Sequence, residues 1–317
     1  MATARPLQGP APVVWLLTDN KPGHRNQLQG LANRLRVLAG ASIHWLEAKR
    51  HPVSLLRALM GLPPKLDGTL PAPNLILAAG TGTHRLLLSL RRLRRCRTTV
   101  LMRPSFPLAW VDAAIIPRHD NPRPSHHVLP TDGVLNAITP LSRLTDKPEA
   151  LILIGGPSRH FDWTNNVVVD QILHLMQQHP DWRWTLSGSR RTPAELMERL
   201  QSLESPKVTV IDHRRCGKDW LASQLAQSRA VWVTPDSGSM VFEAVTSGVP
   251  TGLFELVPSP HSRIAAGIAT LLEDGRVALW SDQAGVMDQG SLLTPRLWEA
   301  DRAANWLIDT LLTDARP

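Results

Sequence analysis

Short apolar runs alternate with amphipathic segments along most of the chain, and polar turns separate them. Short apolar runs bounded by turn residues are typical of strands buried on both faces, whereas apolar residues three and four positions apart are typical of helices. The alternation predicts an α/β fold in which helices cover both faces of a parallel sheet. In the first half, strands are expected at 13–17, 42–46, 75–79, 98–102, 113–116 and 128–129.

The pattern starts again after a polar, proline-containing segment at 136–148. In the second half, strands are expected at 150–154, 182–186, 208–211, 230–233 and 251–256. Helices are expected at 25–38, 51–62, 165–178, 193–203, 220–226, 262–273 and 297–312. Because single cores rarely grow beyond roughly 250 residues, a chain of 317 residues suits two domains. We expect two similar α/β domains, 1–145 and 146–317, with a cleft between them.

The stretch 230–256 is the most informative, because it reads as strand, polar turn, helix and strand. Its turn carries Asp236, Ser237, Gly238 and Ser239, at the carboxyl end of the first strand. The first amides of a helix have no internal partner, so this turn can bind a phosphate. Glu243, one turn inside the helix, can accept a hydrogen bond from a sugar hydroxyl. The same residue types also cap helices, and that alternative stays open.

Several common chemistries lack their motifs. The turn after the first strand is not the glycine-rich turn of a nicotinamide enzyme, and the chain has no Walker loop, no G-x-S-x-G elbow and no Asp-x-Asp. The histidines lack metal-ligand spacing, so no metal is expected. Glycine- and serine-bearing turns at strand ends remain, and these suit a phosphorylated ligand held by backbone amides.

The composition gives the net charge of the chain and indicates the compartment in which it works. The net charge is +8, mostly from arginine, which favours acidic partners. Cys96 and Cys216 make neither a disulfide framework nor a metal set, which fits a reducing compartment. No signal peptide or membrane-spanning run is recognisable, so we expect a cytoplasmic protein.

Four motifs resemble the mitochondrial fission ELM (elongated mitochondria) family, which has many bacterial members. They are TDNKPGHRNQLQGLA at 18–32, IPRHDNP at 116–122, TDGVLNAITP at 131–140 and TPDSGSMVFEA at 234–244. That family is similar to GT-B glycosyltransferases, which have two Rossmann-like domains. The resemblance implies a nucleotide-sugar donor on the C-terminal domain and an acceptor facing the N-terminal one. In that fold a closing helix, here 297–312, commonly returns to the N-terminal domain.

The resemblance also assigns roles by position. The donor diphosphate would lie against Ser237, Gly238 and Ser239, with Glu243 at the ribose. The pocket would be completed by Gly155, Gly156, Ser187, Gly188, Ser189, Arg190 and Arg191. The two arginines can neutralise a leaving diphosphate without metal, although arginines after a strand are often only solvated. His24 is the candidate general base, with Asp19 as its orienter or substitute.

Five arginines lie close together at Arg91, Arg92, Arg94, Arg95 and Arg97. Such a segment suits anionic lipid headgroups, as expected for a transferase with a lipid-linked acceptor at the inner face of the cytoplasmic membrane. A solvated charged face is the alternative. Nucleic acid is not expected, because no aromatic residues are interleaved for base stacking.

Three functions fit these features. The first is a metal-independent glycosyltransferase that moves a sugar from a nucleotide sugar to a cell-envelope acceptor, with no further cofactor. The second is a non-catalytic adaptor on a GT-B scaffold, which the eukaryotic relatives' role in mitochondrial fission implies. The third is a non-hydrolysing sugar-nucleotide epimerase of the same architecture. Because one fold supports many functions, the choice among these three depends on the residues of the site.

Overall fold

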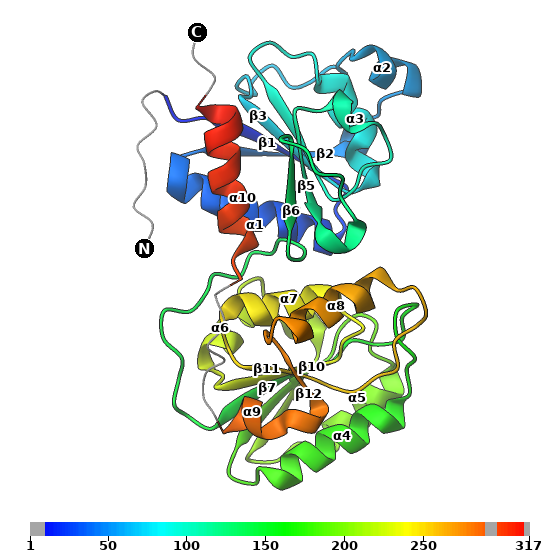
Figure 1. Ribbon diagram of the computed structural model, residues 1–317, viewed down its shortest axis with the longest axis vertical. Coiled ribbons are helices and arrows are strands. Elements are labelled where there is room, and N and C mark those ends of the chain that lie inside the picture. The colour runs from blue at the N-terminus through cyan, green and yellow to red at the C-terminus, as the bar shows by residue number, and fades with distance from the viewer. Residues whose placement is uncertain (1–9, 289–296, 314–317) are drawn as a thin grey trace. The chain divides into compact units, whose positions relative to one another are not determined.

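The strands form two six-stranded sheets, and every strand pair in them is parallel (Figure 1). The computed structural model describes residues 10–288 and 297–313. The chain divides into two compact units. We call the unit with described residues 10–137 and 298–313 the N-terminal unit, and the unit with residues 138–288 and 297 the C-terminal unit. The predicted α/β class with two Rossmann-like sheets is confirmed.

The strands of the N-terminal unit are β1 (Val13–Thr18), β2 (Ser42–Glu47), β3 (Leu75–Ala79), β4 (Arg97–Leu101), β5 (Ala113–Pro117) and β6 (Val128–Thr131). Those of the C-terminal unit are β7 (Glu149–Leu153), β8 (Arg183–Ser187), β9 (Val208–Ile211), β10 (Ala230–Val233), β11 (Thr251–Leu253) and β12 (Ala278–Leu279). The helices are α1 (Pro22–Ala39), α2 (Leu55–Met60), α3 (His84–Leu90), α4 (Asn165–Gln178), α5 (Ala194–Gln201), α6 (Trp220–Gln227), α7 (Gly238–Ser247), α8 (Arg263–Glu273), α9 (Gln283–Met287) and α10 (Glu299–Leu307).

Each sheet reverses its winding direction once. The first has the order β2-β1-β3-β4-β5-β6, so the reversal lies between β1 and β3. The second has the order β12-β11-β10-β7-β8-β9, which is the Rossmann order with its reversal between β7 and β10. In such sheets ligands bind beyond the carboxyl ends of the strands at the reversal. The topology therefore selects two places to search: the ends of β1 and β3, and the ends of β7 and β10.

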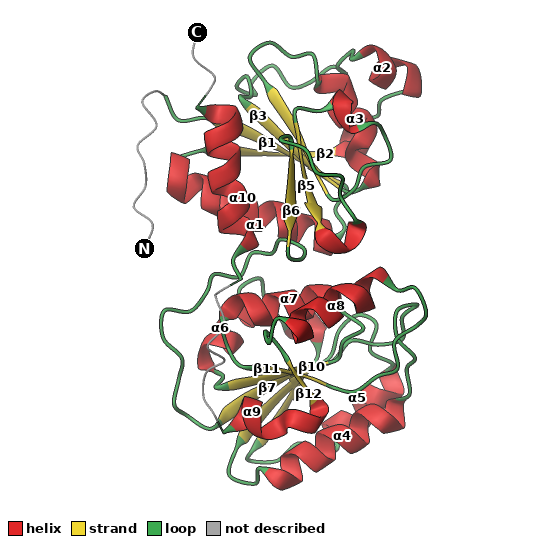
Figure 2. Cartoon of the chain, in the orientation of Figure 1, coloured by secondary structure: helices red, strands yellow, loops and turns green. Residues whose placement is uncertain are grey.

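Helices cover both faces of each sheet, which explains the unbroken apolar strands (Figure 2). All five residues of β3 are buried. In the N-terminal unit one core cluster joins a sheet face to α1 and α10, and a second joins the other face to α3 and Ala58 of α2. The strands need apolar side chains on both sides because both faces are packed.

The C-terminal helix α10 packs on α1 within the N-terminal unit. Ala303, Ala304 and Leu307 enter the same core as the leucines of α1. Arg34 of α1 binds the Asp301 carboxylate, with 2.7 Å from Nε to Oδ1, and its guanidinium lies 4.2 Å from the centre of the Trp298 ring. Apolar packing and a charge pair thus hold the end of the chain on the first unit.

The two units divide between Ala137 and Ile138, whereas the sequence places the boundary at 145/146. The intervening segment belongs to the C-terminal unit: Ile138 is buried, and the Leu141 amide donates to the Ser247 carbonyl at the end of α7. The domain ranges 1–145 and 146–317 also contain residues 1–9, 289–296 and 314–317, which lie outside the described residues.

Some element ends differ from expectation for local reasons. The first helix begins at Pro22 rather than at 25, because proline fits the first helical turn. The helix expected over 51–62 is shortened to α2: Ser54 accepts a hydrogen bond from the Arg57 amide at its start, and Gly61 ends it in the left-handed conformation. The strand β12 and the helix α9 were not predicted, because both are very short.

Candidate functional site

The ends of β7 and β10 meet at a buried carboxylate. Gly155 and Gly156 follow β7, and the Gly156 amide donates to Oδ2 of Asp236 over 3.1 Å. The Gly155 amide donates to the Thr234 hydroxyl over 2.7 Å. A Cβ on Gly155 would overlap the Asp236 carboxylate, and one on Gly156 would overlap the Arg191 carbonyl. Only glycines allow the chain after β7 to pass this close to Asp236.

Asp236 is sealed inside this corner of the fold. Its side chain is 0% exposed, and Oδ2 forms an ion pair with Arg191 Nη2 at 2.6 Å. Burial raises the pKa of the Asp236 carboxyl above its ordinary value, while the Gly156 amide and the Arg191 guanidinium act in the opposite direction. Oδ1 has no hydrogen-bond partner among the described residues. The carboxylate expected to contact a ligand is therefore used inside the fold, where it positions Gly156 and Arg191.

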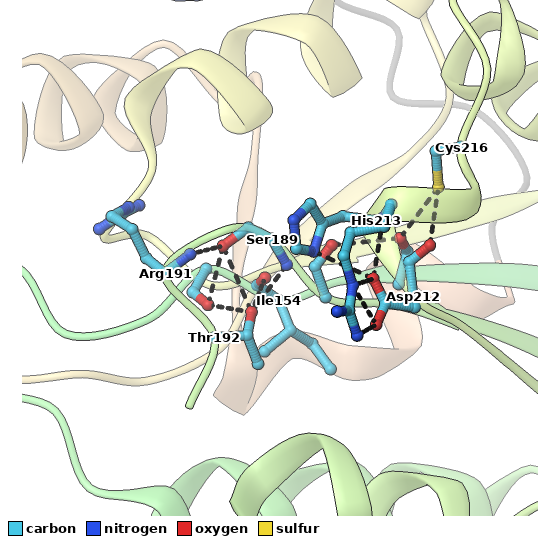
Figure 3. Close-up of polar contacts among 11 residues, drawn as sticks. Ile154, Ser189, Arg191, Thr192, Asp212, His213 and Cys216 are labelled. Carbon is cyan, nitrogen blue, oxygen red and sulfur yellow. Dashed lines mark hydrogen bonds and ion pairs between the residues drawn. The ribbon is translucent and has the colours of Figure 1, made fainter. Parts of the chain in front are cut away.

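A polar turn after β8, which carries Ser189, Arg191 and Thr192 (Figure 3), hydrogen-bonds the Gly155 carbonyl. The Ser189 hydroxyl donates to the Gly155 carbonyl over 3.1 Å, and the Ser189 amide donates to the Thr192 hydroxyl over 2.7 Å. Arg191 Nη1 donates to the Gly156 carbonyl over 3.2 Å. The turn thus fixes the guanidinium of Arg191 at the edge of the corner, with its side chain 39% exposed.

Ser187 ends β8 and Gly188 begins the turn, and both contact other residues of the C-terminal unit. The Ser187 hydroxyl is buried, donates to the Gly188 carbonyl and lies 3.8 Å from Cys216 Sγ. A Cβ on Gly188 would overlap the Met197 sulfur. Beyond them, Asp212 accepts from the Arg214 amide and guanidinium, which holds its pKa well below the ordinary value (Figure 3). Figure 3 places this second cluster beside the 189–192 turn.

The helix α7 begins at the same corner. Ser237 is its N-cap residue, but its side chain makes no capping hydrogen bond in the described structure. The first turn, Gly238-Ser239-Met240, contains no acidic residue, and Ser239 is exposed. Its amides have no intrahelical acceptor, so the helix start is a site of partial positive charge open to an anion. Glu243 is partly buried further along the helix.

The surroundings of this corner carry positive charge. His160 has a lowered pKa, first because it is partly buried, and then because Arg159, Arg191 and Arg263 act on it, whereas Asp236 acts in the opposite direction. Its Nδ1 lies 3.0 Å from the hydroxyl of Ser262, the residue that caps α8. Arg190 is exposed and forms no ion pair in the described part of the chain. Sequence reasoning missed His160 and Arg159; their signal was their position just after the Gly155–Gly156 turn.

The ends of β1 and β3 hold a different pair. His24 Nδ1 lies 2.9 Å from Oδ1 and 3.0 Å from Oδ2 of Asp19. Asp19 also accepts from the Lys21 amide over 3.1 Å, which fixes the turn. The Asp19 side chain is 7% exposed and that of His24 is 21% exposed. Because a carboxylate only accepts, Nδ1 carries the proton, and Nε2 of the neutral ring is left as the acceptor.

Glycines also bring this pair together. Gly80 follows β3 with φ +89, and a Cβ there would overlap His24 Nδ1 and lie 2.6 Å from Asp19 Oδ2. His84, at the start of α3, hydrogen-bonds Ser105 over 2.9 Å, and burial lowers its pKa. The charges of Asp19 and His24 act on His84 in opposite directions. The structure therefore joins Asp19 to His24 and adds His84, which sequence reasoning missed because it lies inside a helical pattern.

The arginines at 91–97 are not equivalent. Arg91 Nη1 and Nη2 donate to the Ala58 and Leu59 carbonyls over 2.6 and 2.7 Å, and Arg97 pairs with Asp112 at 3.1 Å. Arg92, Arg94 and Arg95 are exposed. No helix within the described residues is long and apolar enough to cross a membrane. In residues 10–288 and 297–313, no cluster of three or more His, Cys, Asp or Glu could hold a metal ion.

Sequence comparison identifies relatives. The profile of the family described as mitochondrial fission ELM1 matches residues 22–311. An uncharacterized protein of Rickettsia prowazekii is 22% identical over 299 residues, which cover 76% of this chain and 82% of that protein.

Structure comparison finds GT-B proteins. A putative UDP-N-acetylglucosamine 2-epimerase from Listeria monocytogenes has a TM-score of 0.57 and 11% identity, over 93% of this chain and 94% of that chain. The UDP-GlcNAc 2-epimerase of Methanocaldococcus jannaschii has a TM-score of 0.56 and 13% identity, over 94% and 99%. The Neisseria meningitidis epimerase bound to UDP-GlcNAc has a TM-score of 0.51 and 11% identity, over 95% and 99%. At such identities the likeness shows the fold.

Proposed function

The chain belongs to the mitochondrial fission ELM1 family, and on that premise we propose that it is a GT-B-type glycosyltransferase. It would transfer a sugar from a nucleotide-sugar donor to a cell-envelope acceptor without a metal or a further cofactor. The observation that carries the proposal is the meeting of the open start of α7 with Arg191 and the Gly155–Gly156 turn, at the reversal between β7 and β10.

The donor would bind to the C-terminal unit. Its diphosphate would accept hydrogen bonds from the amides of Gly238 and Ser239, and Glu243 would bind the ribose. Arg190 and Arg191 would neutralise the negative charge that builds up on the leaving diphosphate. Asp236 supports this role without touching the ligand, because its ion pair holds Arg191 at the edge of the corner.

The acceptor would bind to the N-terminal unit, where His24 would be the general base. Nε2 of His24 would take the proton of the acceptor hydroxyl, the acceptor oxygen would bond to the anomeric carbon, and the bond from that carbon to the diphosphate would break. Asp19 would keep the ring in the reactive tautomer and stabilise the imidazolium that forms.

The acceptor class is part of the proposal. We place a lipid-linked acceptor at the inner face of the cytoplasmic membrane, where the exposed arginines Arg92, Arg94 and Arg95 would lie near anionic headgroups. A sugar-nucleotide epimerase is the second candidate, because the solved structures with TM-scores of 0.57 and 0.56 are described as such epimerases.

Nucleotide binding tests the donor site. Uridine diphosphate and a panel of nucleotide sugars would be added to the full chain, and the melting midpoint measured. A ligand at a hundred times its dissociation constant should stabilise the fold by about 2.7 kcal/mol. Glu243→Ala should weaken that stabilisation. Ser239→Asp should abolish binding by repelling the diphosphate, without unfolding the protein, because an acid in the first turn suits the helix dipole.

Ser54→Asp is the matched control, because it places the same charge at the start of α2 in the N-terminal unit and should leave nucleotide binding unchanged. Incubation of the bound donor alone separates the two enzymes: an epimerase changes the sugar, whereas a transferase leaves it until an acceptor is added. If no nucleotide shifts the midpoint at millimolar concentration, both enzyme proposals fail and the adaptor is favoured.

A further inference from the structure

The helix α2 exposes an unusual amount of apolar surface. Of the ten large apolar side chains that are strongly exposed in the described part of the chain, five lie within 55–62. We call these five the α2 patch: Leu55, Leu56, Leu59, Met60 and Leu62, which are 58%, 65%, 43%, 40% and 44% exposed. Exposed apolar residues that gather in one place, rather than singly, mark an interaction surface.

Four residues of the patch form a continuous apolar strip along α2. At about 100° per residue, Leu55, Leu56, Leu59 and Met60 cover roughly 140° of the helix circumference. Arg57 follows at one border of that arc, and Ala58, which is buried, faces the core of the unit. Figure 1 shows α2 beside α3 at the margin of the N-terminal unit. A helix at the margin of the unit with such an apolar face suits insertion into the interface of a lipid bilayer.

Arginine side chains border the patch. Arg91 binds the carbonyls of Ala58 and Leu59, and the Arg92 side chain covers Gly61, which ends α2. Arg94 and Arg95 follow and are exposed. The sequence has no acidic residue from 48 to 66 or from 85 to 111. The patch and its border therefore present leucine and arginine without a compensating carboxylate from these two segments.

An aromatic residue completes the border. Trp110 is 36% exposed, and the Arg91 guanidinium lies 5.6 Å from the centre of its ring. Tryptophan favours the interface between water and lipid, where its ring contacts hydrocarbon and its N–H remains hydrated. Leucine, tryptophan and arginine together are the composition of an interfacial membrane-binding surface.

We propose that the α2 patch inserts into the interface of an anionic lipid bilayer, while Arg92, Arg94 and Arg95 bind the headgroups. A second copy of the chain fits less well, because a symmetric contact through the patch would bring like-charged arginines together. Insertion adds to the proposed function a defined apolar anchor that needs neither donor nor acceptor. The membrane anchor and the proposed transferase activity can therefore fail independently of each other.

Vesicle co-sedimentation of the full chain tests the anchor. Wild type should bind vesicles of phosphatidylcholine mixed with phosphatidylglycerol, and bind phosphatidylcholine alone only weakly. Arg92→Gln/Arg94→Gln/Arg95→Gln should weaken binding to the anionic vesicles about a hundredfold. Leu56→Ser/Leu59→Ser should weaken it at least tenfold, and the remaining binding should vanish in high salt, because salt screens charge but not apolar insertion.

Matched controls exist elsewhere on the chain. Val37→Ser removes an apolar side chain that is 62% exposed on α1, and Arg183→Gln removes an exposed arginine of the C-terminal unit. Both should bind vesicles like wild type, and all variants should keep the wild-type melting midpoint, since the altered side chains are exposed. The proposal is overturned if wild type ignores anionic vesicles, or if the leucine and arginine variants bind as wild type does. It is also overturned if light scattering shows a wild-type dimer that the leucine variant abolishes while no vesicle binds.

Discussion

At each sheet reversal the structure places an aspartate against a basic side chain, and glycines allow the contact. At the end of β1, Asp19 meets His24 over Gly80, and at the end of β10, Asp236 meets Arg191 over Gly155. The first pair contains an imidazole, which has one nitrogen toward Asp19 and a second nitrogen as a further hydrogen-bonding group. In the second, arginine stays charged and the carboxylate is 0% exposed.

This difference separates a pair that can take part in proton transfer from a pair that fixes a charge in place. In the first pair one ring nitrogen is not used by Asp19 and can act on a substrate, whereas in the second the buried carboxylate holds a partly exposed arginine in place. The difference fits the proposed function, in which the N-terminal unit would supply the general base and the C-terminal unit would position the donor. Four measurements would break or sharpen it.

Substitution of His24 should have the largest effect. His24→Gln should lower kcat about 10²- to 10⁴-fold in the proposed transfer reaction, because a general base contributes about that much. Donor affinity and the melting midpoint should not change. Turnover would be measured with the donor found by the binding panel. Asp19→Asn should lower kcat as well, because the amide no longer selects the tautomer. Wild-type turnover in both variants would show that this pair is only structural.

Glycine substitution should give the next largest effect. Gly156→Ala should cost about 2–4 kcal/mol of unfolding free energy, because the new methyl group would overlap the backbone of Arg191, which cannot move alone. Gly217→Ala is the control, since nothing lies within 4 Å of its Cβ position. Urea unfolding would compare the two. Equal stability of the two variants would mean that the turn at Gly156 can move away from Arg191 at little cost.

Loss of Arg191 should have a smaller, pH-dependent effect. Arg191→Gln should cost about 2 kcal/mol at neutral pH, below the roughly 3–5 kcal/mol of a fully buried pair, because Arg191 is 39% exposed. The folded pKa of Asp236 lies above its ordinary value of 3.8, so the folded state holds the proton more tightly than the unfolded state.

The contribution of Asp236 to stability therefore falls as the pH rises from 3.8 through its raised pKa. The cost of Arg191→Gln should shrink as the pH falls through the same window, because a protonated Asp236 needs no cation. Thermal unfolding from acid to neutral pH would follow this cost, with Arg190→Gln as the control that leaves stability unchanged. A pH-independent cost would contradict the sealed ion pair.

The smallest effect is expected for Arg190. Arg190→Gln should weaken nucleotide binding about 5- to 10-fold, the value of one partly solvated charge contact of roughly 1 kcal/mol. Stability should not change, because the side chain is exposed. Calorimetric titration would measure the affinity. Unchanged binding would place Arg190 outside the proposed donor site. Arg191 would then be the arginine that contacts the diphosphate.

Most of the fold was predictable because its signals are local. Apolar runs marked eleven of the strands, and the turn before α7 was recognised from Asp236, Ser237 and Gly238. The role of Asp236 was not predictable, since its partners Gly156 and Arg191 lie 80 and 45 positions away in the sequence. The exposure of Leu56 was not predictable either, because leucines in a short helix normally enter a core.

The sequence alone determined the order of strands, turns and helices, since hydrophobic periodicity and turn chemistry act over a few residues. It also determined which glycines and charged side chains stand at the strand ends. Only the tertiary structure decided which strand ends are neighbours, and so that Asp236 meets Arg191, whereas Asp19 and His24 lie five positions apart in the sequence. Burial, and the pairing of Asp236 with a side chain 45 positions away, depend on segments far apart in the chain, and they make that carboxylate a fixed internal charge.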